Sequence, residues 1–199
     1  MVNRGQAHTL EGVAASLIVL SAMVFAIQMT AVTPLTASTS SQHIENQLQA
    51  TAKGVLVTAS ETGSLRRAML YWNNSSKRFH DTNDAQGYYT NDPPDNDFGD
   101  ALSRAFDSEG IAYNVYLHYA AANGDRLRRR YVYRGVPSDN AISASHAVTL
   151  TDDDALYDDD GTRNATANVA NSDSFYAPDT GDDRSLYNVV RVEVVAWRI

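Results

Sequence analysis

The stretch GVAASLIVLSAMVFAIQMTAV, from Gly12 to Val32, decides the fold because none of its 21 residues is charged. An α-helix rises about 1.5 Å per residue, so this stretch would span roughly 30 Å, the thickness of the hydrocarbon core of a bilayer. We therefore predict a transmembrane helix over residues 12–33, with membrane lipid as its partner. Two alternatives stay open. One is a secretory signal cleaved near Thr36-Ala37-Ser38, although such signals have an apolar region of only about 7–15 residues. The other is a helix buried in a soluble core.

A short polar segment, residues 1–11, precedes the apolar stretch and ends in the pattern RGQAHTLE, from Arg4 to Glu11. This pattern resembles type IV prepilin signals, in which a short basic segment with a glycine precedes the cleavage site. In those proteins the apolar helix, with a glutamate near its start, stays on the mature protein. The whole chain is also similar to a family of uncharacterised haloarchaeal membrane-anchored proteins with an RGQAHTLEG-type start.

The resemblance implies processing and assembly roles for three residues. Cleavage after Gly5 would place Glu11 at position six of the mature chain, and cleavage after Gln6 would place it at position five, the usual position in pilins. In pilin filaments this glutamate pairs with the free amine of a neighbouring subunit, so other pilin-like subunits are implied as partners through the N-terminal helix. A carboxylate at the edge of an apolar helix is costly in lipid unless it is paired. Alternatively, Glu11 lies at the headgroup interface of a plain anchor, where it favours the helix N-terminus.

Beyond the apolar stretch the pattern stays helical as far as residue 72. Pro34 is expected to end or kink the membrane helix, because proline has no amide hydrogen to donate. Apolar residues recur every three to four positions over residues 42–60, which predicts a second helix. They are Ile44, Leu48, Ala52, Val55 and Ala59. Gly63 is expected to end this helix, and residues 64–72 to form a short one.

The remainder predicts a loop, one more helix and then strands. Residues 73–96 are polar and read as a loop, and residues 98–108 as a helix capped by Asp97. Strands are expected at 111–120, 126–134, 142–150 and 186–199, with a turn at Asn123-Gly124-Asp125 and an acidic loop over 151–184.

These elements predict an α+β fold of pilin-like architecture, in which a transmembrane helix continues into helices and then into a small antiparallel β-sheet domain. We divide the chain into a leader-like segment (1–11), the transmembrane helix (12–33), a helical stalk (34–72) and an extracellular α+β domain with acidic loops (73–199).

The charges of the 199 residues are unusual in kind as well as in sum. The net charge is −8, which argues against a nucleic-acid partner, because phosphate contacts need clustered lysine and arginine. Nineteen of the 24 acidic residues are aspartate, and only Lys53 and Lys77 are lysines. At molar salt the Debye length is about 3 Å, so dense carboxylates hardly repel one another. The composition favours a halophile, most readily a haloarchaeon; the alternative is a mesophilic protein with acidic loops.

No catalytic, cofactor or metal site is expected. The chain has no cysteine, its five histidines fall in different predicted elements, and it has neither an HExxH nor a GxSxG motif. The runs Asp152–Asp154 and Asp158–Asp160 suggest calcium, but aligning Gly161 with the glycine of an EF-hand loop leaves both end ligands missing. A solvated acidic loop is the favoured interpretation, and an enzyme is not expected.

Two further patterns concern the surface. Arg126, Arg128 and Arg130 fall on one face of a predicted strand, with Arg129 opposite; they could meet acidic loops of the same or a neighbouring subunit, anionic lipid or glycan, or simply be solvated. Three N-glycosylation sequons lie in predicted loops and begin at Asn73, Asn74 and Asn164. Tripeptides of this kind also arise by chance in loops of such composition.

Together these features predict a single-pass protein of the cell membrane with its C-terminal domain outside the cell. The expected function is that of a pilin-like structural or accessory subunit at the cell surface. The alternative is a membrane-tethered extracellular binding module that does not assemble. The outside placement of the domain depends mainly on the resemblance of residues 4–11 to a processing signal, because the positive charges on the two sides of the apolar stretch are few.

Overall fold

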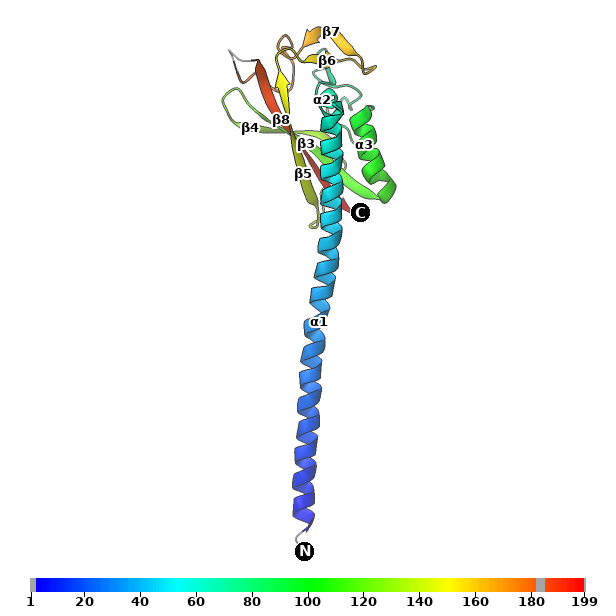
Figure 1. The fold of residues 1–199 in the computed structure, drawn as a ribbon, viewed down its shortest axis with the longest axis vertical. Coiled ribbons are helices and arrows are strands. Elements are labelled where there is room, and N and C mark those ends of the chain that lie inside the picture. The colour runs from blue at the N-terminus through cyan, green and yellow to red at the C-terminus, as the bar shows by residue number, and fades with distance from the viewer. Residues whose placement is uncertain (1–2, 182–184, 199) are drawn as a thin grey trace. The chain divides into compact units, whose positions relative to one another are not determined.

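The structure, a computed structural model, describes residues 3–181 and 185–198, and it describes the side chains of these residues except for 3–6 and 29–41. The chain divides into two compact units, Met1–Ile44 and Glu45–Ile199. The first unit consists of the N-terminal part of helix α1, and the second, here called the head, contains all the other elements (Figure 1).

Helix α1 runs from Asn3 to Glu61 without an interruption in its backbone assignment. The prediction of a separate second helix over residues 42–60 is therefore wrong, and of the two effects expected of Pro34, an end or a kink, the helix does not end there. Proline removes only one backbone hydrogen bond from a helix, and neighbouring turns of a long helix can tolerate that loss, as they do in membrane helices. The leader-like segment, the apolar stretch and most of the stalk thus belong to one element.

The part of α1 in the head has an apolar stripe close to the predicted one. Of the predicted residues, Leu48, Ala52 and Ala59 are buried, Val55 is half-buried, and Ile44, which precedes the head in the chain, is exposed; Leu56, which the sequence did not predict, is buried as well. Gly63 adopts a left-handed conformation (φ 72°) at the end of α1, a backbone that glycine reaches without a Cβ clash, and the short helix α2 (Ser64–Met69) follows at once.

The head is built on a four-stranded antiparallel sheet. Its strands are β3 (Ile111–Ala120), β4 (Arg126–Tyr133), β5 (Ile142–Thr151) and β8 (Leu186–Arg198), in the order β4-β3-β8-β5. These match the four predicted strands. The final strand, β8, lies in the interior of the sheet and pairs on both sides.

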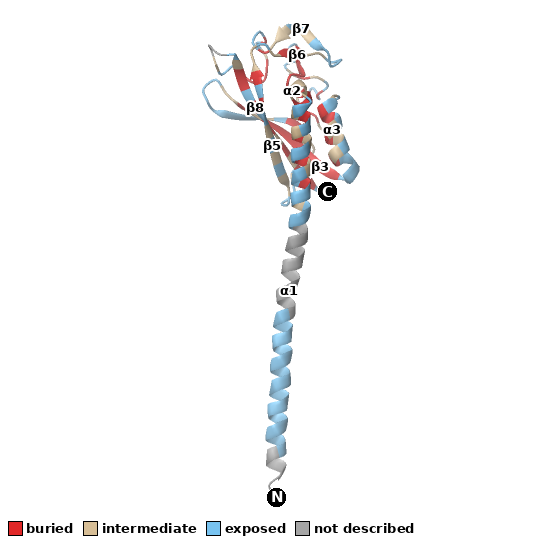
Figure 2. Cartoon of the chain, viewed as in Figure 1, coloured by how far each residue is buried: buried red, intermediate tan, exposed pale blue. Residues whose placement is uncertain are grey.

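The two faces of this sheet differ sharply. On β8, Val190, Val192 and Val194 are fully buried on the face that belongs to the hydrophobic core, while Val189 and Arg191 are exposed on the other face. The core contains residues of this inner face together with buried residues of α1, α2 and α3 (Asp97–Phe106). Buried positions accordingly concentrate inside the head (Figure 2).

Two regions predicted as loops contain short paired strands. Strands β1 (Trp72–Asn73) and β2 (Arg78–Phe79) form one pair, and β6 (Ala155–Tyr157) and β7 (Arg163–Asn168) form another. Most of these strands have only two or three residues, too few to show the alternation that identifies a strand. A 3₁₀ turn, Asp107–Glu109, follows α3.

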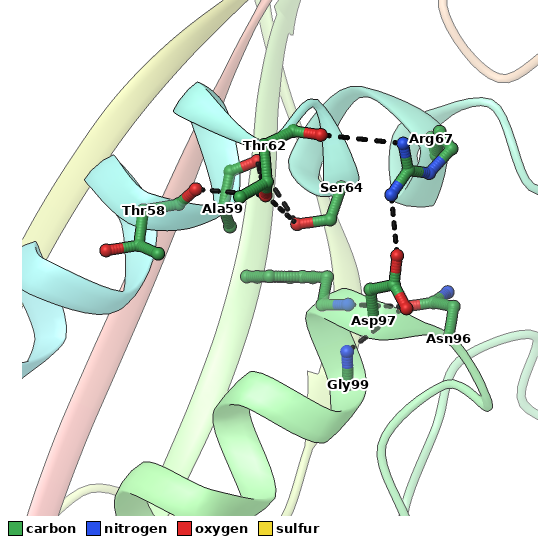
Figure 3. Close-up of polar contacts among 9 residues, drawn as sticks. Thr58, Ala59, Thr62, Ser64, Arg67, Asn96, Asp97 and Gly99 are labelled. Atoms are coloured by element: carbon green, nitrogen blue, oxygen red, sulfur yellow. Dashed lines mark hydrogen bonds and ion pairs between the residues drawn. The ribbon is translucent and has the colours of Figure 1, made fainter.

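The fold is therefore α+β, with an apolar N-terminal helix followed by antiparallel sheets. One detail of α3 differs from expectation: its cap is Asn96 and not Asp97. The Asn96 side-chain oxygen accepts hydrogen bonds from the amides of Phe98 and Gly99 (Figure 3). Either residue type can cap a helix, so the sequence alone does not choose between two adjacent candidates.

Candidate functional site

The N-terminal helix is the first candidate for a functional role. Ala7–Gln28 is long and apolar enough to cross a membrane, and its described side chains are all exposed. Large apolar residues such as Ile18 and Phe25 are 70% and 67% exposed, respectively. Soluble proteins rarely expose a continuous apolar surface of this size, so the segment needs lipid or another apolar partner.

Two polar side chains inside this segment have their hydrogen bonds supplied locally. The Ser16 hydroxyl donates to the carbonyl of Val13 (2.9 Å), and the Ser21 hydroxyl donates to that of Leu17 (2.7 Å). Each hydroxyl has one proton, and the bond to the carbonyl uses it, so neither serine has a proton left to donate to water. These two serines are therefore compatible with a hydrocarbon environment.

The three residues to which the resemblance assigns processing and assembly all lie in the backbone of α1. Glu11 is exposed, with its Oε2 atom 3.7 Å from Nδ1 of His8, three residues earlier. The side chain of Gln6 and the surroundings of Gly5 lie outside the described residues. Glu11 is the one aspartate, glutamate, lysine or arginine of Ala7–Gln28, so its free energy in lipid depends on finding a partner.

The junction between α1 and α2 is fixed by a polar network (Figure 3). The Ser64 hydroxyl donates to the carbonyl of Ala59 (3.2 Å) and lies 3.0 Å from the Thr62 hydroxyl. The Arg67 guanidinium reaches across to Asp97 of α3, with Nη2 2.6 Å from Oδ2. The network ties the end of α1 to the start of α3.

Beside this junction the head has a cleft of about 400 Å³, which we call the acidic cleft. Four carboxylates line it, from Asp95, Asp97, Asp159 and Asp160, and Arg67 is its one cationic residue. Of the four, only Asp97 has an ion-pair partner among the described residues. The acidic cleft is therefore suited to bind a cation, in particular a guanidinium or ammonium group.

Tyr71 forms one wall of the acidic cleft. Its hydroxyl lies 2.9 Å from Oδ2 of Asp81 and 2.7 Å from the carbonyl oxygen of Asp159, two acceptors for a single proton. Burial, followed by the hydrogen bond to Asp81, raises the pKa of Tyr71, so the phenol stays neutral at ordinary pH. Sequence reasoning missed this cleft because it joins segments that are distant in the chain and carry no motif.

The predicted separation of the arginines is confirmed by the register of the sheet. Arg128 pairs with His118 and Arg130 with Tyr116, on the face away from the core, while Arg129 pairs with Leu117 on the core face. Arg129 lies over the Trp72 ring, 5.0 Å from its centroid, and burial lowers its pKa.

The aspartates of the two acidic runs between β5 and β8 have different hydrogen-bond and ion-pair partners. Asp154 forms an ion pair with Arg66, with Nη2 of Arg66 2.5 Å from Oδ2 of Asp154. The Asp154 carboxylate also accepts a hydrogen bond from the backbone amide of Thr151 (2.7 Å). Asp160 accepts from the amide and hydroxyl of Thr162, which lowers the pKa of the Asp160 carboxyl. In the described part of the chain, no three acidic or histidine side chains gather in a way that could hold a metal ion.

The three sequon asparagines differ in how their side chains are held. Asn164 donates its amide to Asp158 (2.8 Å), whereas the side-chain oxygens of Asn73 and Asn74 act as acceptors, for Ser75 and Ser174 among others. Asn74 is exposed, and its side-chain nitrogen has no hydrogen-bond partner among the described residues. If the protein is glycosylated, Asn74 presents the most accessible nitrogen.

Comparison with known proteins gives one match. A family model with the description "Family of unknown function (DUF7288)" matches residues 4–196. No curated protein and no solved structure matches the chain.

Proposed function

This chain belongs to DUF7288, a family of unknown function, and we propose that it is a membrane-anchored cell-surface protein of pilin-like build. It serves as a structural or accessory subunit whose apolar helix packs against other such helices, and its head lies outside the cell. The DUF7288 match covers the N-terminal pattern, the apolar stretch and the head together, so these parts occur as one unit in the family.

One observation carries this proposal: a single helix contains both the apolar segment and a stripe that packs in the head. Ala7–Gln28 is exposed and apolar, and the same element, α1, contributes Leu48, Ala52, Leu56 and Ala59 to the core of the antiparallel-sheet head. A plain anchor needs only a tether to its domain. Here the apolar segment and part of the core of the head belong to one helical element.

The charge composition supports a head that faces a saline environment. The aspartate-rich, lysine-poor chain suits high salt, where carboxylates repel one another little and keep the surface hydrated. On this basis we place the protein in a haloarchaeon.

The first test of the proposal is the mature N-terminus. Protein purified from its native membrane should begin after Gly5 or Gln6, as seen by intact-mass measurement and N-terminal peptide mapping. An intact N-terminus would remove the pilin-like processing. A new N-terminus near residue 38 would show instead that the apolar segment is a cleaved signal.

The second test is charge reversal of Glu11. The Glu11→Lys variant should remain in the membrane but no longer cross-link to neighbouring copies, because the carboxylate cannot pair with a free amine. Glu61→Lys, at the exposed end of the same helix in the head, is the matched control and should assemble normally. Unchanged cross-linking of the Glu11 variant would contradict an assembly role.

A second function has an observation of its own. The acidic cleft, with three carboxylates that lack an ion-pair partner among the described residues, suits a membrane-tethered module that binds a cationic ligand. An intact N-terminus, together with a purified protein that does not self-associate, would favour this alternative.

A further inference from the structure

The outer face of the sheet carries a concentration of arginine that is unexpected in a chain with a net charge of −8. Four exposed arginines lie on it, Arg126, Arg128 and Arg130 on β4 and Arg191 on β8, and we call them the arginine face. Arg128, His118 and Arg191 form one row across three strands, since Arg128 and Arg191 both pair with His118. Neighbouring strands lie about 4.8 Å apart, so these charges are close together.

Nothing in the described part of the chain neutralises the arginine face. None of its four guanidiniums forms an ion pair there. Glu193 carries the one carboxylate on the strands of this sheet. It forms a hydrogen bond with His118, whose Nε2 atom lies 2.7 Å from Oε2 of Glu193. These four guanidiniums can therefore form ion pairs with a partner molecule.

Aromatic rings hold two of the guanidiniums in place. Arg128 lies 4.0 Å from the centroid of Tyr116, and Arg130 lies 4.2 Å from that of Tyr133. Side chains restrained in this way lose less conformational entropy when they bind, which favours specific contacts over diffuse attraction.

The same chain carries the chemical complement of this face. The acidic cleft presents Asp95, Asp159 and Asp160, all exposed and without an ion-pair partner among the described residues, and none of its lining residues belongs to β4 or β8. Arginine forms two parallel hydrogen bonds with one carboxylate, and this short-range geometry persists when salt screens longer-range forces.

We propose that the arginine face of one copy binds the acidic cleft of a second copy. This inference rests on the proposed assembly of the protein and names the contact between heads. An orientation that places arginine against carboxylate gains paired, charge-assisted hydrogen bonds that other orientations of two copies do not form. The two surfaces differ, so the contact is head-to-tail, and contacts of this type build rings or filaments rather than closed dimers.

The test uses the full chain in detergent micelles, with sedimentation velocity at fixed salt as the readout. Arg126→Glu, Arg128→Glu and Arg130→Glu are combined in one variant, and Asp159→Lys and Asp160→Lys in another. Each variant alone should weaken self-association at least tenfold. A one-to-one mixture of the two should associate again, because the swapped charges still complement each other.

Two controls separate specific contact from general charge. One control variant combines Lys53→Glu, Lys77→Glu and Arg104→Glu. It changes the net charge as much as the arginine variant does, but at exposed positions away from the arginine face, and it should leave association unchanged. Replacing Arg126, Arg128 and Arg130 by lysine keeps the charge but removes the paired hydrogen bonds, and should weaken association several-fold. Circular dichroism verifies that each variant is folded.

Three results would overturn the inference: unchanged association of the arginine variant, failure of the mixture to recover, or a wild-type protein that stays monomeric. If the arginine variant instead loses binding to vesicles of anionic phospholipid while self-association is unchanged, the occupant is lipid and not a second copy. These outcomes are independent of the N-terminal mass and of the Glu11→Lys result, so the proposed function can survive the loss of this contact.

Discussion

Tyr131 and Tyr176 belong to one aromatic cluster, yet their hydroxyl groups meet different surroundings. Both rings contact Phe79, at centroid distances of 4.7 and 5.1 Å, respectively. The Tyr131 hydroxyl donates to the carbonyl of Ala68 (3.2 Å), whereas the Tyr176 hydroxyl is buried with no hydrogen-bond partner among the described residues. Burial raises the pKa of both phenols, so both are neutral at ordinary pH.

We therefore expect the two hydroxyls to have opposite effects on stability. Tyr176→Phe removes an unpaired buried polar group and should raise the free energy of unfolding by about 1 kcal/mol. Tyr131→Phe removes a hydrogen bond and should lower that free energy by about 1 kcal/mol. Urea unfolding of the full chain in detergent, followed by tryptophan fluorescence, measures both, since Trp72 lies 5.6 Å from the Tyr176 ring. A loss of stability in Tyr176→Phe would mean that the hydroxyl has a partner.

At the scale of the element, Gly99 shows how closely α3 packs against the chain that precedes it. A Cβ atom at Gly99 would lie 1.8 Å from the carbonyl oxygen of Pro94, a backbone atom that cannot move aside easily. Gly54, in the part of α1 that belongs to the head, has no atom within 4 Å of the corresponding position. Close packing thus requires a glycine at position 99, whereas position 54 has room for a larger side chain.

Substitution by alanine should accordingly have opposite signs at these two glycines. Gly99→Ala should lower the free energy of unfolding by about 3 kcal/mol through overpacking. Gly54→Ala should raise it by about 0.5–1 kcal/mol, because alanine is the better helix former. Thermal unfolding followed by circular dichroism distinguishes the two. Equal melting temperatures for Gly99→Ala and the wild type would show that α3 can shift away from Pro94.

Elements with long periodic patterns could be predicted from the sequence, and short ones could not. The alternation in β5 and the repeat in α1 identify these elements because burial on one face imposes a period. Strand β3 is buried on both faces, and its β-branched and aromatic residues identify it instead. The pairs β1–β2 and β6–β7 have no such period, and their pairing is set by tertiary contacts. The acidic cleft is invisible to the sequence for the same reason, since its carboxylates come from separate segments.

At the scale of the whole molecule, the core belongs entirely to one of the two units. Every residue of the hydrophobic core lies between Leu48 and Ala196, inside the head, Glu45–Ile199. The described side chains of Ala7–Gln28 contribute nothing to it, because all of them are exposed. The head should therefore not need the N-terminal segment for its stability.

A chain that starts at Glu45 should fold and remain soluble without detergent. Its melting temperature should lie within about 5 °C of the value for the full chain, because few stabilising contacts are removed; 1 kcal/mol shifts the melting temperature of a domain of this size by about 2–4 °C. Differential scanning calorimetry on both chains checks this. A much lower melting temperature for the shorter chain would show that residues before Glu45 stabilise the head.

The position of β8 inside the sheet also governs when the head can form. Strands β3 and β5 pair with β8 but not with each other, and β3 pairs otherwise only with the edge strand β4. Without β8, β3 therefore pairs only with β4, and β5 has no partner in this sheet. Pairing across so many intervening residues is slow, because loop-closure entropy is lost before the contacts form. The sheet of the head can therefore be completed only after residues 186–198 have been synthesised.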